Sequence, residues 1–408
     1  MSELSYLEKL LDGAEVEWLP LSSLCNLITT GKLNANAMED NGAYPFFTCN
    51  EEPYRINTYA FDLEAILISG NGSQVGHLNY YNGKFNAYQR TYILGGFNEN
   101  VDIMYLYYYL MHTLKPYIHK NSRKGSVPYI TMPMLENFKF PIPCPNNLEK
   151  SLAIQSEIVR ILDKFTALTA ELTAELNMRK KQYNYYRDQL LSFKEGEVEW
   201  KSLGEIATKI YSGGTPDTKR IDYWENGTIP WMSSGEVNLK NIERTEKYIT
   251  EAGLNNSSAK LVPKNSVVIA LAGQGKTRGK VARIRIALTT NQSLAALTFD
   301  EKKFSSDYVF HFLETQYESL RQISSGNSGR GGLNLQMISA YKIPIPCPDN
   351  PEKSLAIQSE IVRILDKFDT LTNSITEGLP REIELRQKQY EYYRDLLFSF
   401  PKPETVSN

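Results

Sequence analysis

Residues 149–165 read EKSLAIQSEIVRILDKF, and residues 352–368 repeat all 17 residues without a change. Over the wider stretches 139–165 and 342–368, 24 of 27 positions agree, including twin PIPCP segments. A second pair of similar blocks follows, RKKQYNYYRDQLLSF at 179–193 and RQKQYEYYRDLLFSF at 386–400. The offset between the two copies grows from 203 residues in the first pair to 207 in the second. Between the repeats the two halves differ. We therefore expect one scaffold used twice with two different working surfaces; the alternative is a duplication without symmetric function.

The junctions between the repeats predict a cyclic, pseudo-two-fold arrangement. EVEW occurs at 15–18 and 197–200, each time just before a variable segment. In the middle of the chain, the second repeated block leads directly into EVEW. At the C-terminus the same block comes last, so we expect it to meet the first variable segment in space.

The composition is that of an ordinary globular chain of two to four domains, with 408 residues, 41% hydrophobic and 23% charged. No apolar run reaches the ~18 residues of a membrane span, and no signal-peptide pattern opens the chain. The four cysteines form no CxxC pair, which favours a reducing cytoplasm.

The net charge of −2 is unevenly distributed along the chain. Residues 21–148 hold 9 basic and 9 acidic side chains, whereas residues 201–348 hold 19 and 13. The remaining, mostly repeated, segments hold 17 and 25. A basic variable segment beside acidic helices favours polyanion binding by the variable parts and protein contacts by the helices.

Residues 149–193 contain no Gly or Pro and predict one long helix. Its apolar residues form a heptad seam for a partner helix, which we expect to be the other copy running antiparallel; two separate helical hairpins are the alternative. The seam consists of Ile154, Ile158, Ile161, Phe165, Leu168 and Leu172. TAEL follows in tandem at 169–176 and locally rotates the seam. In the second copy, Gly378 and Pro380 predict a break.

The two variable segments share a faint common plan. Residues 65–69 and 267–271 are predicted buried strands, each followed by a polar glycine loop, at 70–77 and 272–280. Another strand and a Gln-bearing stretch come next, at 86–90 and 289–293. Residues 105–110 and 308–313 predict matching helices. Two polar segments, 122–131 and 325–336, precede the repeats. Equivalent positions with different polar residues are typical of two domains that recognise different sequences.

The sequence ALAGQGKT at 270–277 resembles a phosphate-binding P-loop only formally. Such a loop must open a helix, whereas RGKVARIRIAL predicts a strand. Five basic residues with no acid nearby in sequence favour a DNA contact instead, and a solvated basic hairpin is the alternative. They are Lys276, Arg278, Lys280, Arg283 and Arg285.

No catalytic constellation is present in the sequence. The four histidines form no metal-spaced cluster, and motifs for amino-methylation, cofactor binding and nuclease activity are missing. We therefore expect a chain that recognises rather than reacts, and that binds no S-adenosylmethionine, ATP or metal itself.

The PIPCP segments, the repeats, the TAEL tract and the dissimilar variable segments together resemble the specificity subunit of type I restriction–modification systems, particularly the IC group, over the full length. The resemblance implies an α/β (α+β) fold with two small target recognition domains. Long antiparallel coiled-coil helices separate them with pseudo-two-fold symmetry. The expected parts are the first recognition domain at 1–148, a spacer helix at 149–196, the second recognition domain at 197–351 and distal spacer helices at 352–408.

The resemblance also implies partners and a division of labour. Each recognition domain reads half of a split double-stranded DNA site, and the helices set the spacer and dock two methyltransferase subunits. Restriction subunits join the full complex. S-adenosylmethionine, ATP and Mg²⁺ are expected on those partners. The alternatives are a DNA-binding scaffold without such partners and a stand-alone methyltransferase.

The glycine loops and the polar stretches after them are the predicted DNA-binding sites, because Arg pairs with guanine, Gln and Asn pair with adenine, and Lys contacts bases or phosphates. For the first domain the residues are Asn71, Ser73, Gln74, His77, Tyr88, Gln89, Arg90, Arg123 and Lys124. For the second they are Gln274, Lys276, Arg278, Lys280, Asn291, Gln292, Arg330 and Asn334.

Overall fold

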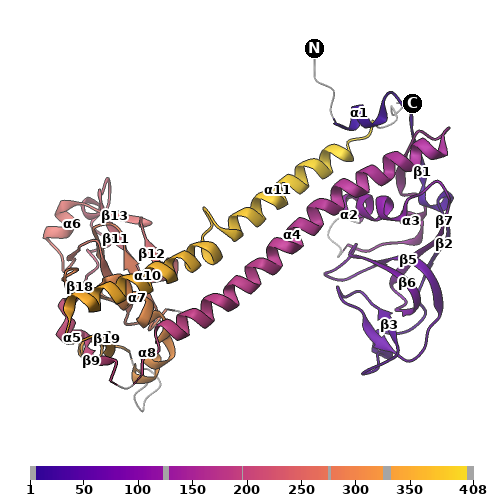
Figure 1. Ribbon diagram of the computed structural model, residues 1–408. Coiled ribbons are helices and arrows are strands. Elements are labelled where there is room, and N and C mark those ends of the chain that lie inside the picture. The colour runs from indigo at the N-terminus through magenta and orange to yellow at the C-terminus, as the bar shows by residue number, and fades with distance from the viewer. Residues whose placement is uncertain (1–5, 123–127, 195, 274–276, 325–331, 402–408) are drawn as a thin grey trace. The chain divides into compact units, whose positions relative to one another are not determined.

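The chain forms two compact units, which are described here one by one. The computed structural model describes residues 6–122, 128–194, 196–273, 277–324 and 332–401 (Figure 1). Unit 1 consists of Met1–Thr173 and Glu382–Asn408, and unit 2 consists of Ala174–Arg381. Each unit thus contains one variable segment, the helix that follows it and the closing block of the other repeat. This grouping is the one that the repeat junctions predict.

Unit 1 contains one large sheet, a small ribbon and short helices. The strands are β1 (Val16–Pro20), β2 (Cys25–Thr30), β3 (Tyr44–Phe47), β4 (Tyr54–Ile56), β5 (Phe61–Ser69), β6 (Leu78–Ala87), β7 (Thr91–Phe97) and β8 (Lys139–Pro143). The helices are α1 (Tyr6–Leu11), α2 (Ile103–Asn121) and α3 (Met132–Glu136), with 3-10 turns η1 (Leu21–Ser23) and η2 (Ala35–Ala37).

The large sheet of unit 1 has the order β2-β7-β5-β6-β3-β4, and only β3 and β6 pair in parallel. Its central strand β5 is covered on both faces. Ile66 and Ile68 pack into a core with α2, whereas Ala65 and Leu67 pack with Phe47 and Phe85. Burial on both faces explains why this strand is an unbroken apolar run instead of an alternating one.

Unit 2 repeats this plan with more and shorter strands. They are β9 (Val198–Ser202), β10 (Ala207–Ser212), β11 (Ile229–Met232), β12 (Asn241–Ile242), β13 (Lys247–Ile249), β14 (Leu261–Val262), β15 (Ser266–Ala270), β16 (Val281–Ile284), β17 (Leu288–Thr290), β18 (Leu294–Phe299) and β19 (Lys342–Pro346). The helices are α5 (Leu203–Ile206), α6 (Glu251–Asn255), α7 (Ser306–Thr315), α8 (Tyr317–Ser324), α9 (Leu335–Ala340) and α10 (Pro351–Asn373), with 3-10 turns η3 (Ile221–Tyr223) and η4 (Ser234–Leu239).

The strand pairings of unit 1 recur in unit 2, which adds the pairs β12–β16 and β14–β17. One sheet has the order β10-β18-β15-β16-β12 and the other β13-β11-β17-β14. The parallel pair β11–β17 joins Met232 to Thr290 just as β3–β6 joins Phe47 to Ala87. Two strands, β16 and β17, stand where unit 1 has the single long β6, so one sheet becomes two. The predicted strands at 65–69 and 267–271, the strands after both glycine loops, and the helices at 105–110 and 308–313 are confirmed.

The long helix α4 spans Leu148–Leu190, as the repeat predicts, while the second copy is broken into α10 and α11 (Leu379–Leu397). In unit 1, α11 runs beside the first half of α4 in the opposite direction (Figure 1), and Phe165 stacks on Tyr393 with ring centroids 5.4 Å apart. In unit 2, Phe368 stacks on Tyr186 at 5.6 Å. These pairs occupy the same positions in the two copies and confirm antiparallel packing of the repeats.

The heptad seam has a different first half from the one predicted. Ile154 and Ile158 pack into the core of unit 1 together with Leu162, which the seam did not include and which is fully buried. The first turns of α4 therefore pack in the core of the variable domain, and Phe165 makes the ring contact with the other copy.

Each variable domain is attached to its helix by the same bonds. Gln155 Oε1 accepts from the backbone N–H of Asp102 at 2.8 Å, and Gln358 Oε1 accepts from that of Ser305 at 3.0 Å. The hydroxyl of Tyr105 donates to the carbonyl of Pro141, and that of Tyr308 to Pro344. Gln155 and Gln358 are repeat residues that bond backbone groups, and the same tyrosine recurs in both variable domains, so domains of unrelated surface sequence are attached in the same way.

The closing blocks also take equivalent places. Leu397, Phe398 and Phe400 are buried in the core of unit 1, and Leu191 is buried in that of unit 2. Trp18 of the first EVEW donates through Nε1 to the carbonyl of Pro401 at 2.8 Å. The C-terminal block therefore meets the first variable segment, as the repeated junctions predict.

Candidate nucleic-acid interface

In unit 1, the glycine loop, the Gln-bearing stretch and the segment before the repeat meet at one edge of the sheet. The backbone N–H of Gly70 donates to the carbonyl of Arg90, and that of Ile130 donates to the carbonyl of Gly70, both at 2.9 Å. A side chain at Gly70 would place its Cβ 2.4 Å from the Arg90 carbonyl oxygen, so only glycine allows this approach. Three segments distant in sequence thus form one loop cluster.

Unit 2 builds the same loop cluster with different residues. Leu271 N–H donates to the carbonyl of Ser293 at 2.8 Å, and Leu333 N–H donates to the carbonyl of Leu271 at 3.1 Å. Tyr88 and Asn291 are also equivalent, because their N–H groups donate to the carbonyls of Phe47 and Met232. The shared backbone plan predicted from sequence is therefore present in both units.

The predicted contact residues in the glycine loop of unit 1 have unequal exposure. Ser73 is exposed, and Asn71 accepts from Cys49 Sγ at 3.2 Å. Gln74 donates to Glu51 Oε1 at 2.9 Å. His77 is half-buried, and its Nε2 atom is buried without a hydrogen-bond partner among the described residues, so this atom does not face solvent.

The Gln-bearing stretch of unit 1 is more accessible. Gln89 and Arg90 are exposed, and Tyr88 is half-buried. The backbone of Gln89 is fixed by its N–H donating to Leu33 at 2.9 Å, which leaves the side chain free for another contact. Together with Ser73 and Gln74 these residues give the cluster donors and acceptors of the kind that read base edges.

In unit 2, two of the predicted residues are held by neighbours in the cluster. Gln292 is exposed, and its Oε1 accepts from Thr215 Oγ1 at 2.6 Å. Lys280 donates to Asn238 Oδ1 at 2.7 Å, and Arg278 is half-buried.

Two predicted asparagines of unit 2 have local structural roles. Asn291 Oδ1 accepts from Ser293 N–H at 3.1 Å, and Asn334 Oδ1 accepts from Met337 N–H at 2.9 Å as the N-cap of α9. Each uses its acceptor oxygen within the protein, and the amide nitrogen is the donor that a base contact would use.

Five predicted contact residues lie outside the residues that the structure describes. They are Arg123, Lys124, Gln274, Lys276 and Arg330.

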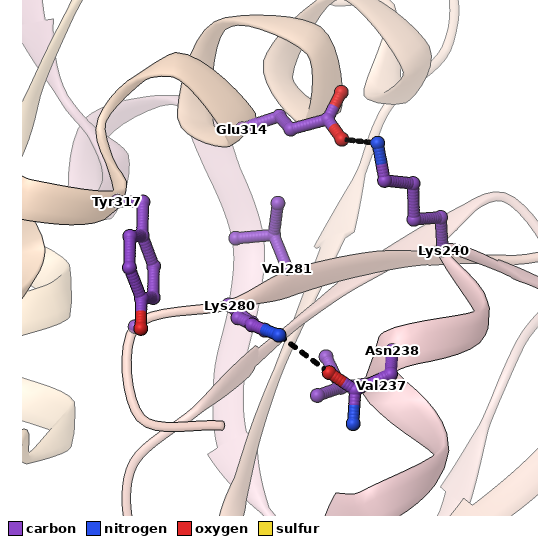
Figure 2. Close-up of a pocket in the computed structure, with 8 residues that line it drawn as sticks. Val237, Asn238, Lys240, Lys280, Val281, Glu314 and Tyr317 are labelled. Carbon is purple, nitrogen blue, oxygen red and sulfur yellow. Dashed lines mark hydrogen bonds and ion pairs between the residues drawn. The ribbon is translucent and has the colours of Figure 1, made fainter. Parts of the chain in front are cut away.

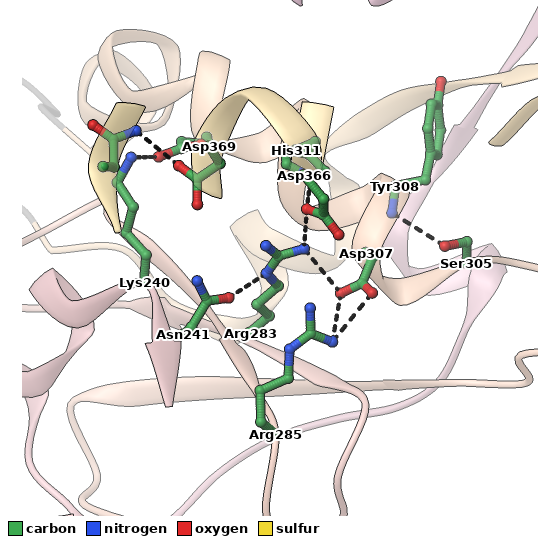
Figure 3. Close-up of polar contacts among 12 residues, drawn as sticks. Lys240, Asn241, Arg283, Arg285, Ser305, Asp307, Tyr308, His311, Asp366 and Asp369 are labelled. Carbon is green, nitrogen blue, oxygen red and sulfur yellow. Dashed lines mark hydrogen bonds and ion pairs between the residues drawn. The ribbon is translucent and has the colours of Figure 1, made fainter. Parts of the chain in front are cut away.

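The prediction that Arg283 contacts DNA is wrong, and so is the alternative of a solvated position for it. Its side chain is only 5% exposed and lies 2.7 Å from Asp366 and 3.4 Å from Asp307. Figure 3 shows its guanidinium turned inward, with Nε donating to Asn241. Arg285 also pairs with Asp307, at 3.0 Å. No acid is near these arginines in sequence, but folding brings two acids to them, so both arginines form ion pairs within unit 2.

A cavity of about 180 Å³ lies at the base of the second glycine loop (Figure 2). Gly279, Lys280 and Val281 form one wall, and Tyr317 and Glu314 form another. Its lysines are engaged, because Lys240 pairs with Glu314 and Lys280 bonds Asn238.

Sequence reasoning missed several residues of the two clusters. Thr215 holds Gln292, Glu51 holds Gln74, and Asn238 holds Lys280. Thr215 follows Gly213 and Gly214 just after strand β10, and this pair of glycines is a signal that the sequence offered. Glu51 lies in an irregular segment and Asn238 in the 3-10 turn η4, and neither position carries such a signal.

The structure also bears on the cysteines, on metal binding and on membrane-spanning helices. All four cysteines are free, and burial raises the pKa of the Cys25 thiol to about 12. Within the described ranges no group of three or more His, Cys, Asp or Glu side chains is placed to hold a metal ion. None of the described helices is long and apolar enough to cross a membrane.

The family whose description is "Type I restriction modification DNA specificity domain" matches residues 14–179 and 195–385. The match therefore covers both variable domains and the identical 17-residue segment that follows each of them. The chain belongs to this type I specificity family. Its fold class, with two sheet-rich domains and long antiparallel helices, is that of the family's specificity subunits.

Relatives and solved structures agree with this membership. The Escherichia coli type I restriction enzyme EcoR124I/EcoR124II specificity subunit is 45% identical over 423 residues, covering 100% of both chains. The Escherichia coli EcoprrI specificity subunit is 38% identical and covers 92% of this chain and 93% of its own. The type I S subunit from M. genitalium shares the fold, with a TM-score of 0.60, 16% identity and coverage of 96% and 98%.

Proposed function

We propose that this type I specificity chain reads a split DNA site, one half with each loop cluster, and that each unit docks one methyltransferase subunit. Restriction subunits join through those partners. The observation that carries the proposal is the duplicated loop cluster, which has the same backbone hydrogen bonds in both units but different polar side chains. A common backbone arrangement that carries different side chains suits two domains that recognise different DNA sequences.

The chemistry of each cluster suits base reading. Unit 1 presents the exposed side chains of Ser73, Gln89 and Arg90, and unit 2 presents Gln292, which is exposed, and Lys280, which is half-buried. Arg pairs bidentately with guanine and Gln with adenine in the major groove, whereas Lys contacts bases or phosphates. The other residues predicted from sequence remain candidates for the same role.

The repeated helices support two docking sites for one kind of partner. Tyr185 and Tyr392 occupy the same position in the two copies, and they are 62% and 65% exposed. Each lies edge-on against its neighbouring tyrosine, at 5.4 Å and 5.3 Å between centroids. Exposed, rigidly held tyrosines are frequent anchors of protein interfaces.

Catalysis and cofactor binding belong to the partners in this proposal. S-adenosylmethionine would bind the methyltransferase subunits, and ATP and Mg²⁺ would serve the restriction subunits. The chain itself then contributes recognition and geometry without catalytic groups.

Mapping of methylated bases by sequencing tests the proposal in cells that contain the chain and its methyltransferase. Arg90→Ala and Gln292→Ala should each relax one base position, in different halves of one site, at about 1–3 kcal/mol of lost discrimination. Lys302→Ala, at an exposed position outside both clusters, should leave the pattern unchanged. Relaxation in the same half, or no relaxation in either variant, would overturn the assignment of the readers.

A further inference from the structure

The 17 identical residues of the repeat have different surroundings in the two units. In unit 1, α1 packs on the first turns of α4, where Leu7 and Leu11 are 2% and 7% exposed. Tyr6 donates to Glu157 Oε1 at 3.2 Å, and Asp12 lies 3.7 Å from Lys150 Nζ. Because residue 6 meets 157 and residue 12 meets 150, α1 runs antiparallel to α4.

The surface beneath α1 is a stripe of one helix face. Lys150, Ile154 and Glu157 follow the i, i+4, i+7 spacing that places side chains in one row. Ile154 is 3% exposed, and the side chain of Glu157 is 28% exposed. The two leucines of α1 therefore pack near the apolar centre of the stripe, at Ile154. The aspartate meets the cation at one end, Lys150, and the tyrosine hydroxyl meets the anion at the other, Glu157.

The same stripe is open in unit 2. Lys353, Ile357 and Glu360 are its identical counterparts on α10, and they are referred to below as the α10 stripe. Lys353 is exposed, Ile357 is partly exposed, and the side chain of Glu360 is 55% exposed. Within the described residues, Lys353 Nζ makes no ion pair and Glu360 pairs only with its helical neighbour Arg363.

The chain of unit 2 has no second α1. In unit 1 the closing block (Leu397 to Phe400) and α1 both contribute to the core, whereas in unit 2 the closing block around Leu191 leads directly into β9. The difference between the stripes therefore comes from one short helix and not from the sequence beneath it.

We propose that the α10 stripe is a docking site for one amphipathic helix of a protein partner, with α1 as the template for that helix. The partner helix carries two leucines four residues apart, an aromatic hydroxyl before the first and a carboxylate after the second. It runs antiparallel to α10, so that its carboxylate meets Lys353 and its hydroxyl meets Glu360. Since α1 closes the stripe on α4, this partner binds once per chain, unlike a partner that uses the exposed tyrosines of both copies.

A synthetic peptide with the sequence of residues 1–14, held helical by a hydrocarbon staple between positions 5 and 9, tests the site. Calorimetry with the full chain should show one saturable site, of about 10–100 µM because a short apolar contact must exceed the loss of freedom on binding. Deleting residues 1–12 from the chain should open the α4 stripe and raise the number of peptide sites to two.

Two variants locate the peptide. Ile357→Glu should lower the affinity at least tenfold, whereas Ser359→Glu, which adds the same charge at an exposed position beside the stripe, should not. Since Ile357 also contacts the core of unit 2, a charge exchange at an exposed residue provides the second test. Lys353→Glu should weaken the peptide a few-fold, and a peptide with Asp12→Lys should restore its affinity.

The outcomes are distinct. One site that is lost in Ile357→Glu, together with weaker binding to Lys353→Glu that the Asp12→Lys peptide restores, supports the proposal. Absence of saturable binding to the full chain overturns it, as does binding that neither α10 variant changes. Base mapping of DNA is not involved, so these results stand apart from those on half-site reading.

Discussion

The same aspartate of the repeat has a different partner in each unit. Asp163 accepts from the hydroxyl of Tyr108 at 2.6 Å, and Asp366 contacts His311 Nε2 at 2.8 Å. Position 311 is the counterpart of position 108, since both lie 55 residues before the aspartate. Arg283 is added only in unit 2 (Figure 3). The repeat therefore offers a fixed acceptor, and each variable domain supplies its own donors.

Removing this acceptor should destabilise unit 2 more than unit 1. Asp366→Ala leaves Arg283, which is 5% exposed, short of one of its carboxylates, and we expect a loss of about 2–4 kcal/mol of unfolding free energy. Asp163→Ala is the matched control, because it removes one hydrogen bond at an exposed residue, for about 1 kcal/mol. Urea unfolding with hydrogen exchange resolved by unit measures both, and equal losses would contradict the burial argument.

The same contact predicts a pH dependence. Burial disfavours the charge of Asp366, but the hydrogen bond with His311 and the charge of Arg283 outweigh burial and hold the pKa of this carboxyl below its usual value. Its stabilising contribution is therefore complete above an unfolded-state pKa of about 3.9 and is lost as pH falls through the lower folded-state pKa. The unfolding free energy of Asp366→Ala should therefore fall less steeply at acid pH than that of the unchanged chain. An equal fall in both proteins would contradict this prediction.

At the scale of elements, the break in the second repeat helix follows from two residues. Helix α10 ends at Asn373 and α11 begins at Leu379, with Pro380 in its first turn. Gly378 has φ +83° in the left-handed region, which few side chains adopt. The break was predictable because Gly and Pro act locally. The burial of Leu162 was not, because it depends on which face of α4 meets the variable domain.

Gly378→Ala separates strain from steric contact. An added Cβ would lie 2.4 Å from the Thr370 carbonyl oxygen, besides the strained φ. Gly196→Ala is a matched control, since it has φ +86° and no atom within 4 Å of the added Cβ. We expect about 1 kcal/mol of lost unfolding free energy at 196 and about 2–4 kcal/mol at 378. Thermal unfolding of both variants gives the difference, and equal values would mean that the turn relaxes freely.

At the scale of the whole molecule, the repeated junctions allowed the prediction that the C-terminal block meets the first variable segment. The equivalence of Arg90 with Ser293 follows from the Gln-bearing stretch visible in both halves. The equivalence of Gly70 with Leu271 was not predicted, because the sequence placed residue 271 in a strand that ends at Ala270 in the structure. The inward direction of Arg283 was not predictable, because Asp307 and Asp366 are distant in sequence and only the fold brings them together. It was likewise not predictable that α1 covers the stripe on α4 and leaves the identical stripe on α10 exposed, since identical sequences gave no reason to expect different neighbours.

The division between the units falls at Thr173 and Ala174, inside the second TAEL. A third TAEL after Leu176 would add four helical residues, about 6 Å of length and about 40° of net rotation. One base pair of B-DNA advances about 3.4 Å and turns by about 36°. The rotation matches one base pair, whereas the excess length must be absorbed by helix crossing or DNA bending. Deleting one TAEL should shorten the spacer or abolish activity.

Mapping the methylated sites of the three-TAEL variant by sequencing therefore tests most directly whether two readers are held apart by a helical ruler. We predict the same two half-sites with a spacer longer by one base pair. An unchanged spacer would mean that α4 is a mere linker, and a changed half-site would mean that the readers lie elsewhere in the chain.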